Sequence, residues 1–454
     1  MAAIQNTGKQ LSAFGLLMIA VVTVDSIRNL SINAQFGLPV ITFYLFAGLT
    51  FFLPVGILTA KLAMRYPNTG GSYLWIRGAF GTRWSFVSIW LQWVYNMLWY
   101  PTIFPFIATA IAGMFFPQLE TNAHYILITS LILFWIITAI SCFGIRAVSG
   151  IAIFCAILGT LFPMLLIIGL GAYWLLTGHA SATPLSWSHL MPDHESMINI
   201  AFFVNVLFSL IGLDVVGIHA GDVKNPKKTY PWIVGIAAVL VLVTMALSSL
   251  ALAIVVPPAK IGLLNGLIDV AQVFFAAYHI SWGVPLIGAA IILGSFGIAS
   301  SWIIGLARTL HVASGDANMP RFLQKKNRHD MPYNILLTQA VIVTVLLSAY
   351  LLLPSVNATY WILAAMSSQL GLVYYVLLFI AAFKLLRKEA ALPILLLFVL
   401  GVLTAGIGIY VGFLPPAHLS SLGDLAHYEG VMLAVIAAFM LPLLWFLRKR
   451  QAMR

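Results

Sequence analysis

Long runs of apolar residues, separated by short polar segments, occupy most of the chain. A run of about 20 apolar residues is long enough to cross a hydrocarbon core as a helix. Twelve such runs have approximate limits of 11–35, 38–62, 84–115, 123–143, 150–176, 197–220, 232–256, 284–312, 335–353, 359–383, 392–413 and 429–447. The pattern therefore predicts an all-α polytopic membrane protein with 12 transmembrane helices.

Two of these runs carry a carboxylate near their middle. Residues 23–29 of the first run read Thr-Val-Asp-Ser-Ile-Arg-Asn, and residues 209–217 of the sixth read Ser-Leu-Ile-Gly-Leu-Asp-Val-Val-Gly. A charge at this depth costs roughly 2.5–3.5 kcal/mol on insertion scales, so Asp25 and Asp214 indicate a functional site by default. We interpret both runs as broken helices with a ligand bound between them.

The two predicted breaks are five spans apart. Five-span units repeated with opposite topology place two discontinuous helices around a binding site at the midplane. The spacing therefore predicts a 5+5 inverted repeat with broken helices 1 and 6. The first repeat would occupy residues 1–180 and the second residues 181–390. Residues 391–454 would then hold spans eleven and twelve and a short cytoplasmic tail.

Composition and charge fit the same class of protein. Hydrophobic residues make up 62% of the chain and charged residues 8%, whereas about 25% of a soluble protein is charged. The net charge of +11 could suggest a nucleic-acid partner. However, all of the 23 basic residues except Arg28 and Lys260 fall in segments on the same predicted side of the membrane. This asymmetry follows the positive-inside rule, so we expect cytoplasmic termini and no nucleic-acid binding.

Signals for catalysis are missing from the sequence. Cys142 and Cys155 both lie in apolar runs, without the spacing of a disulfide framework or a metal site. No nucleophile–base set or phosphate-binding loop can be recognised. We therefore expect neither an enzyme nor a cofactor or metal.

The first break supplies the candidate substrate-binding residues Thr23, Asp25, Ser26, Ile27 and Arg28. The N-terminus of a half-helix attracts a carboxylate, and the exposed carbonyls at the end of another attract an ammonium group or a cation. A zwitterionic amino acid would satisfy both. In the alternative interpretation, Asp25 and Arg28 lie three residues apart on one helix, pair with each other and serve packing only.

The second break supplies Ser209, Gly212 and Asp214 as further candidates. Glycine lets the backbone leave helical geometry and lets a ligand approach closely. Here the alternative is a glycine-mediated helix contact, with Asp214 bonded to a neighbouring span.

Spans three and eight complete the predicted site with Trp93, Asn96, Ser295 and Trp302. Aromatic rings can form the walls of a pocket and bind a cation, although packing is the common role of any one of them. Ion coupling is assigned to side chains that can carry a proton or offer oxygen ligands to a cation. These candidates are Asp25, Asp214, Ser300 and Ser301.

Three segments resemble a known family of transporters. They are residues 53–56 (Leu-Pro-Val-Gly) through 66–75 (Tyr-Pro-Asn-Thr-Gly-Gly-Ser-Tyr-Leu-Trp), 212–214 (Gly-Leu-Asp) through 222–226 (Asp-Val-Lys-Asn-Pro), and 299–305 (Ala-Ser-Ser-Trp-Ile-Ile-Gly) through Arg308. With them the chain resembles the amino acid–polyamine–organocation (APC) superfamily of secondary transporters, most closely its glutamate:GABA antiporter branch. The resemblance implies a LeuT-type fold and a central amino-acid site between spans one, three, six, eight and ten.

The resemblance also implies alternating access by exchange or by proton coupling, in the inner membrane of a bacterium. The expected substrate is a small-molecule amino acid or derived amine, and the expected assembly a monomer or homodimer in the lipid bilayer. A non-transporting sensor or a channel-like protein on the same fold is the alternative function.

Two departures from the family pattern affect the site. The glycines common in span one of the superfamily are replaced by Val24-Asp25-Ser26, so this break is where the chain is expected to differ in what it binds. A basic residue often found in span five is replaced in the apolar run around Ile153. Together with Ser300 and Ser301, that replacement leaves sodium symport open as an alternative coupling.

Overall fold

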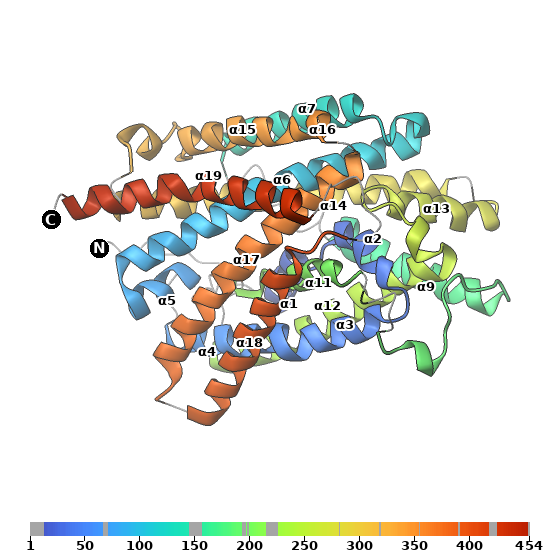
Figure 1. Cartoon of the computed structure of the whole chain (residues 1–454), viewed down its shortest axis with the longest axis horizontal. Coiled ribbons are helices and arrows are strands. Elements are labelled where there is room, and N and C mark those ends of the chain that lie inside the picture. The colour runs from blue at the N-terminus through green and yellow to red at the C-terminus, as the bar shows by residue number, and fades with distance from the viewer. Residues whose placement is uncertain are drawn as a thin grey trace.

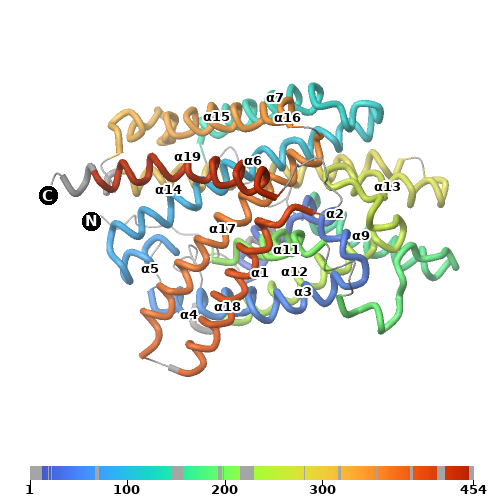
Figure 2. Tube along the Cα trace, viewed as in Figure 1, coloured from blue at the N-terminus to red at the C-terminus, as the bar shows by residue number. Residues whose placement is uncertain are grey.

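The computed structural model is built from helices throughout the residues it describes (Figure 1). These residues are 13–66, 71–144, 157–192, 197, 199–214, 226–280, 282–316, 319–353, 355–388, 391–416 and 425–452. In the view of Figures 1 and 2, helices α6, α7, α15 and α19 run roughly from left to right.

Ten helices in the described residues are long and apolar enough to cross a membrane. Each coincides with one of the predicted runs, so ten of the predicted spans are confirmed as helices, while the total of twelve stays a prediction. They comprise α3 (Val40–Ala47) with η3 (Gly48–Phe52) and α4 (Leu53–Arg65), α6 (Thr82–Phe115), α7 (Ala123–Ser141), η5 (Ile157–Leu161) with α9 (Phe162–Leu176), α12 (Pro226–Val255), α14 (Gly283–Asp316), α15 (Tyr333–Leu347) with α16 (Ala349–Leu352), α17 (Val356–Leu386), α18 (Ala391–Val411) and α19 (Leu425–Ala452).

The first predicted span is interrupted where the sequence indicates. Helix α1 (Ala13–Val24) ends just before Asp25, whose backbone N–H still donates to the carbonyl of Val21 at 2.7 Å. Ser26 is extended, with φ −132° and ψ 103°. The chain then continues in short pieces, namely η1 (Ile27–Asn29), α2 (Leu30–Asn33) and η2 (Ala34–Phe36).

The helix in the sixth predicted span also ends within its run. It begins as η7 (Ile200–Phe202) and α11 (Phe203–Phe208), and it leaves helical geometry at Ile211 and Gly212. Residues 215–225 lie outside the described part of the chain. In the described residues both helices thus end where the sequence indicates, while broken helices 1 and 6 and the inverted repeat that would relate them stay predictions.

Gly212 brings the two interruptions into direct contact. Its φ of +122° is a backbone conformation that residues with a side chain rarely adopt. A Cβ atom built on Gly212 would also lie 2.8 Å from the carbonyl oxygen of Thr23. Only glycine fits this close approach between the two breaks.

Two shorter helices lie at opposite ends of the bundle in Figure 1: α5 (Gly71–Phe80) near the left end and α13 (Gly266–Ala277) near the right. Helix α13 contacts α14, α12, α2 and α6. Helix α13 was not predicted from the sequence, because its 12 residues are too few to span a membrane.

The centre of the bundle is formed by α6, α14 and α17, which share the most extensive helix contacts. A second close contact joins η5 to α14. A Cβ atom on Gly159 would lie 2.1 Å from the Cα atom of Gly294, so the two backbones touch with no side chain between them.

Candidate substrate site

A small cavity lies beside the two interruptions. Its lining residues come from the first break, α6, the region of the second break and α14: Thr23, Val24, Asp25, Ser26, Asn29, Tyr95, Asn96, Trp99, Phe208, Ile211, Ile298 and Trp302. Its volume, counted as the space in which the centre of a water molecule fits, is about 40 Å³. That is room for a few waters but not for an amino acid, so a substrate of that size would have to widen the cavity.

Asp25 is the only carboxylate among the described residues that line this cavity. It is 1% exposed, and its Oδ2 atom accepts a hydrogen bond from the hydroxyl of Thr244 on α12 at 2.9 Å. Its Oδ1 atom is buried without a partner in the part of the chain that the structure describes. A buried carboxylate with one free oxygen is costly, and it is suited to an ammonium group or a proton.

Arg28 does not pair with Asp25. Its side chain is 1% exposed and lies against α17, where Nη1 donates to the hydroxyl of Tyr360 at 3.0 Å. The centre of the Tyr360 ring lies 5.7 Å from the guanidinium carbon. The internal ion pair of the packing interpretation is therefore not formed, and the two charges of the break face different helices.

Asp214, the carboxylate of the second break, is bonded to α17. Its Oδ2 accepts from the hydroxyl of Tyr374 at 2.6 Å and its Oδ1 from that of Tyr375 at 2.5 Å. The Tyr375 oxygen also accepts the backbone N–H of Gly212 at 2.8 Å. Asp214 does not line the cavity, and its contacts match the interpretation in which it is bonded to a neighbouring span.

A buried polar network joins Ser209, a predicted site residue, to three residues that were not predicted from the sequence. Asn205 donates to Asn33 at 3.0 Å, Asn33 donates to the hydroxyl of Tyr44 at 2.6 Å, and that hydroxyl lies 3.0 Å from Ser209 Oγ. The network joins α2, which follows the first break, to α11 and α3. Asn33 and Asn205, amide side chains within apolar runs, were the available signal.

The other predicted site residues are divided between the cavity and its surroundings. Five of those predicted to bind substrate line the cavity, namely Thr23, Asp25, Ser26, Asn96 and Trp302. Seven do not, namely Ile27, Arg28, Trp93, Ser209, Gly212, Asp214 and Ser295. Trp93, for example, donates to Gln339 on α15 at 3.2 Å.

The candidate sodium ligands bond within their own helix. The hydroxyls of Ser300 and Ser301 donate to the carbonyl of Gly297 at 2.9 and 3.0 Å. Ser300 is buried, and Ser301 is exposed on α14. Ile153 lies outside the described residues. No group of three or more His, Cys, Asp or Glu side chains that could hold a metal ion occurs among the described residues.

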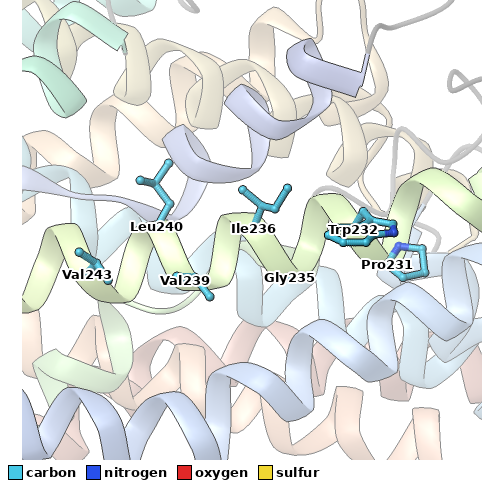
Figure 3. Close-up of a pocket in the computed structure, with 7 residues that line it drawn as sticks. All are labelled: Pro231, Trp232, Gly235, Ile236, Val239, Leu240 and Val243. Atoms are coloured by element: carbon cyan, nitrogen blue, oxygen red, sulfur yellow. The ribbon is translucent and has the colours of Figure 1, made fainter.

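A second hollow follows one face of α12 and differs from the first in every lining residue (Figure 3). It is lined by Pro231, Trp232, Gly235, Ile236, Val239, Leu240 and Val243, all from this one helix. Trp232 is 75% exposed. An apolar, exposed face on a spanning helix is the surface that acyl chains cover, so we assign this hollow to lipid.

A pair of acidic residues lies outside the spans, between the segment that follows α6 and the start of α13. The amide nitrogen of Asn265 donates to Asp269 at 2.8 Å and to Glu120 at 3.4 Å. Glu120 is 9% exposed, and its Oε1 atom has no partner in the described residues. Burial, and then the negative charge of Glu120, raise the pKa of Asp269 to about 7.

An apolar helical bundle with a small cavity that a buried carboxylate lines, where two of its helices end within apolar runs, is typical of a membrane protein that handles a small polar solute. The profile of the amino acid permease family matches residues 9–441, so the chain belongs to that family, within the APC superfamily. It is a transporter and not an enzyme.

Curated relatives point the same way. The chain is similar to an uncharacterised transporter of Legionella pneumophila, at 41% identity over 91% of each chain. It is also similar to the glutamate/γ-aminobutyrate antiporter of Lactococcus lactis subsp. lactis, at 25% identity over 96% of this chain and 90% of that protein. A probable agmatine/putrescine antiporter of the same organism is 25% identical over 86% of this chain and 82% of that protein. Family and relatives together support amino-acid transport.

Proposed function

We propose that this protein carries amino acids or their derived amines across the bacterial inner membrane by alternating access, as an exchanger or a proton-coupled symporter. One observation carries the proposal: the cavity between the two interrupted spans holds a buried carboxylate, Asp25, with an unpartnered oxygen. An ammonium group is the part of an amino acid that this oxygen would bind. The antiporter names of the relatives favour exchange.

The proposed fold arrangement is the 5+5 inverted repeat, with residues 1–180 and 181–390 as its two units and both termini in the cytoplasm. The close contact of Gly212 with Thr23 favours it, because it joins the interruptions of the first and sixth spans at one point. In this arrangement the cavity would widen and open to each side of the membrane in turn.

We divide the roles of the two carboxylates. Asp25 would bind the substrate ammonium group or carry the coupled proton, since one of its oxygens is free. Asp214 would hold the second break against α17 through two tyrosines. Sodium coupling stays the alternative, because the hydroxyls of Ser300 and Ser301 donate their protons to the carbonyl of Gly297 and keep their oxygen lone pairs for a cation.

Transport by purified protein in liposomes tests the proposal. Radiolabelled amino acids and amines would be offered with and without unlabelled substrate inside, and with imposed proton or sodium gradients. We expect saturable uptake that internal substrate stimulates if the protein is an exchanger, or that a proton gradient drives if it is a symporter. Flux that does not saturate would indicate a channel, and binding without any flux would indicate a sensor.

A matched pair of tryptophan variants links the flux to the cavity. Trp302 lines the cavity, whereas Trp232 lies on the exposed apolar face of α12 (Figure 3). Trp302→Leu should lower the apparent affinity for substrate, and Trp232→Leu should leave it unchanged. Equal effects of the two substitutions would contradict the proposed location of the site.

A further inference from the structure

Arg28 is a buried positive charge that lacks a counter-charge. The guanidinium group stays protonated in proteins, and the Arg28 side chain is 1% exposed. No carboxylate of the described residues lies within ion-pair distance of it, and Asp25, the nearest along the chain, is bonded to Thr244. A buried charge without a partner is strongly unfavourable, which points to an anion as a missing partner.

The free part of the guanidinium has a definite shape. Nη1 is occupied by the hydroxyl of Tyr360, whereas Nε and Nη2 are both buried without a hydrogen-bond partner in the described residues. Nε and Nη2 form one edge of the planar group, and their N–H bonds are nearly parallel. This is the fork that binds the two oxygens of a carboxylate side by side.

Tyr360 holds this fork in place. Its hydroxyl lies 3.0 Å from Nη1 and 3.5 Å from the backbone carbonyl of Arg28, and its ring faces the guanidinium at 5.7 Å. Tyr360 itself is fully buried on α17. A fixed orientation reduces the entropy lost when a ligand binds, so the edge is preorganised for an anion.

The position of Arg28 relates the fork to the cavity. Its neighbours Ser26 and Asn29 both line the cavity, although the Arg28 side chain does not. Asp25 faces α12 and Arg28 faces α17, so the break presents a negative and a positive group on different sides. A substrate larger than the present cavity must widen it, and widening next to Asn29 would bring a carboxylate to the free edge.

We propose that the Nε–Nη2 edge of Arg28 receives a carboxylate of the transported amino acid, so that Arg28 distinguishes amino acids from amines that lack a carboxylate. The inference deepens the proposed function and rests on it. Asp25 would hold the ammonium end of the same molecule. A dipolar substrate then satisfies both buried charges of the break, whereas a simple amine satisfies only one.

Binding to purified full-length protein tests this with four compounds of similar size. Glutamate has two carboxylates, glutamine only the α-carboxylate, γ-aminobutyrate only the distal one, and butylamine none. Affinities would be measured by calorimetry for the wild type, Arg28→Gln, Arg28→Lys and Arg308→Gln. Arg308 is the matched control, because its side chain is 41% exposed and near Asp330 at 3.7 Å.

We expect the wild type to bind at least one carboxylate-bearing compound more tightly than butylamine. Arg28→Gln should weaken that binding by roughly 10- to 100-fold, the usual loss for hydrogen bonds to a charged group. Arg28→Lys should lose less, Arg308→Gln should lose nothing, and butylamine should change little in any variant. A loss for glutamine assigns the fork to the α-carboxylate, and a loss for γ-aminobutyrate assigns it to the distal one.

Several results would overturn the inference. One is equal weakening of all four compounds by Arg28→Gln, which indicates a structural role. Another is wild-type binding of butylamine as tight as that of the amino acids, a comparison that needs no folded variant. A third is substrate binding that requires chloride, with Arg28→Gln lowering the affinity for all ligands equally. That result would assign the Nε–Nη2 edge to an inorganic anion. Failure of the wild type to bind or carry any amino acid or amine would instead refute the proposed function itself.

Discussion

The two buried carboxylates of the broken spans have similar settings in the sequence and different settings in the structure. Asp214 accepts hydrogen bonds on both oxygens, from two neighbouring tyrosines of α17. Asp25 accepts one, from Thr244, and its second oxygen has no partner in the described residues. A satisfied carboxylate in the membrane stabilises the fold around it, whereas a half-satisfied one is available to a ligand. Burial alone does not separate the two roles, but hydrogen-bond saturation does.

Replacement of Asp25 should give the largest effect. Asp25→Asn keeps the shape of the side chain and its contact with Thr244 but removes the charge, so uptake in liposomes should fall by roughly 100-fold, as when a buried charge pair is broken. The thermal stability of the purified protein should change little. Unaltered uptake in both Asp25→Asn and Asp214→Asn would show that neither carboxylate acts in transport.

Replacement of Asp214 should reverse this pattern. Asp214→Ala leaves the hydroxyls of Tyr374 and Tyr375 buried without their acceptor, at a cost of about 3 kcal/mol in the free energy of unfolding. The measurement is denaturation in detergent, with substrate binding per folded molecule as a second readout. If Asp214→Ala keeps full stability but abolishes binding, the comparison between the carboxylates is wrong.

Gly212→Ala tests the contact between the breaks. The substitution adds a side chain at φ +122° and places its Cβ atom 2.8 Å from the Thr23 carbonyl oxygen, which should cost about 2 kcal/mol. Gly235→Ala on α12 is the control, because a Cβ atom there meets nothing within 4 Å. Similar melting temperatures of the two variants would mean that the close approach is not rigid.

The two tyrosines that bond Asp214 should differ in importance. Tyr375 also accepts the backbone N–H of Gly212, a buried donor that Tyr374 does not bind. Tyr375→Phe should therefore destabilise the protein by about 1 kcal/mol more than Tyr374→Phe. Thermal denaturation of both variants gives the comparison, and a larger loss in Tyr374→Phe would contradict it.

The smallest effect concerns pH. The pKa of Asp269 is raised to about 7 in the folded protein, whereas an unfolded Asp titrates near 4. The folded state thus holds an extra proton between these values, so stability should fall as the pH rises from about 4 to about 7 and stay level above that. Solvent screening limits the fall to about 1 kcal/mol.

Melting temperatures between pH 5 and pH 8 check this dependence. Asp269→Asn should flatten the curve. Asp330→Asn is the control, because the exposed Asp330 has a pKa lowered by Lys326 and stays ionised over this range. A wild-type curve that rises with pH would contradict the assigned direction.

The sequence predicted the parts of the fold that depend on hydrophobic length and missed those that depend on partners. Ten spans and the interruptions near Asp25 and Gly212 follow from apolar runs and from polar residues within them. The hydrogen bonds of Asp214 could not be predicted, because Tyr374 is 160 residues away in the chain. Arg28 was placed with Asp25 by spacing alone, and its partner Tyr360 is 332 residues away.

The candidate site was predicted in part for the same reason. Asp25 and Ser26 line the cavity because the break itself forms one wall, and local sequence identifies a break. Phe208 and Ile298 were missed as lining residues, since which face of a helix points inward is decided by its neighbours. An apolar pattern on all faces gives little information about that choice.

The contact between Gly159 and Gly294 bears on how the cavity could open. Side chains usually act as spacers that let two helices roll over each other, but here two main chains lie against each other with no such layer. Separating them would open a gap that no side chain can fill. We therefore expect the fifth and eighth spans to travel as one rigid body, so that Ile298 and Trp302 on α14 move away from the broken spans together with the fifth span.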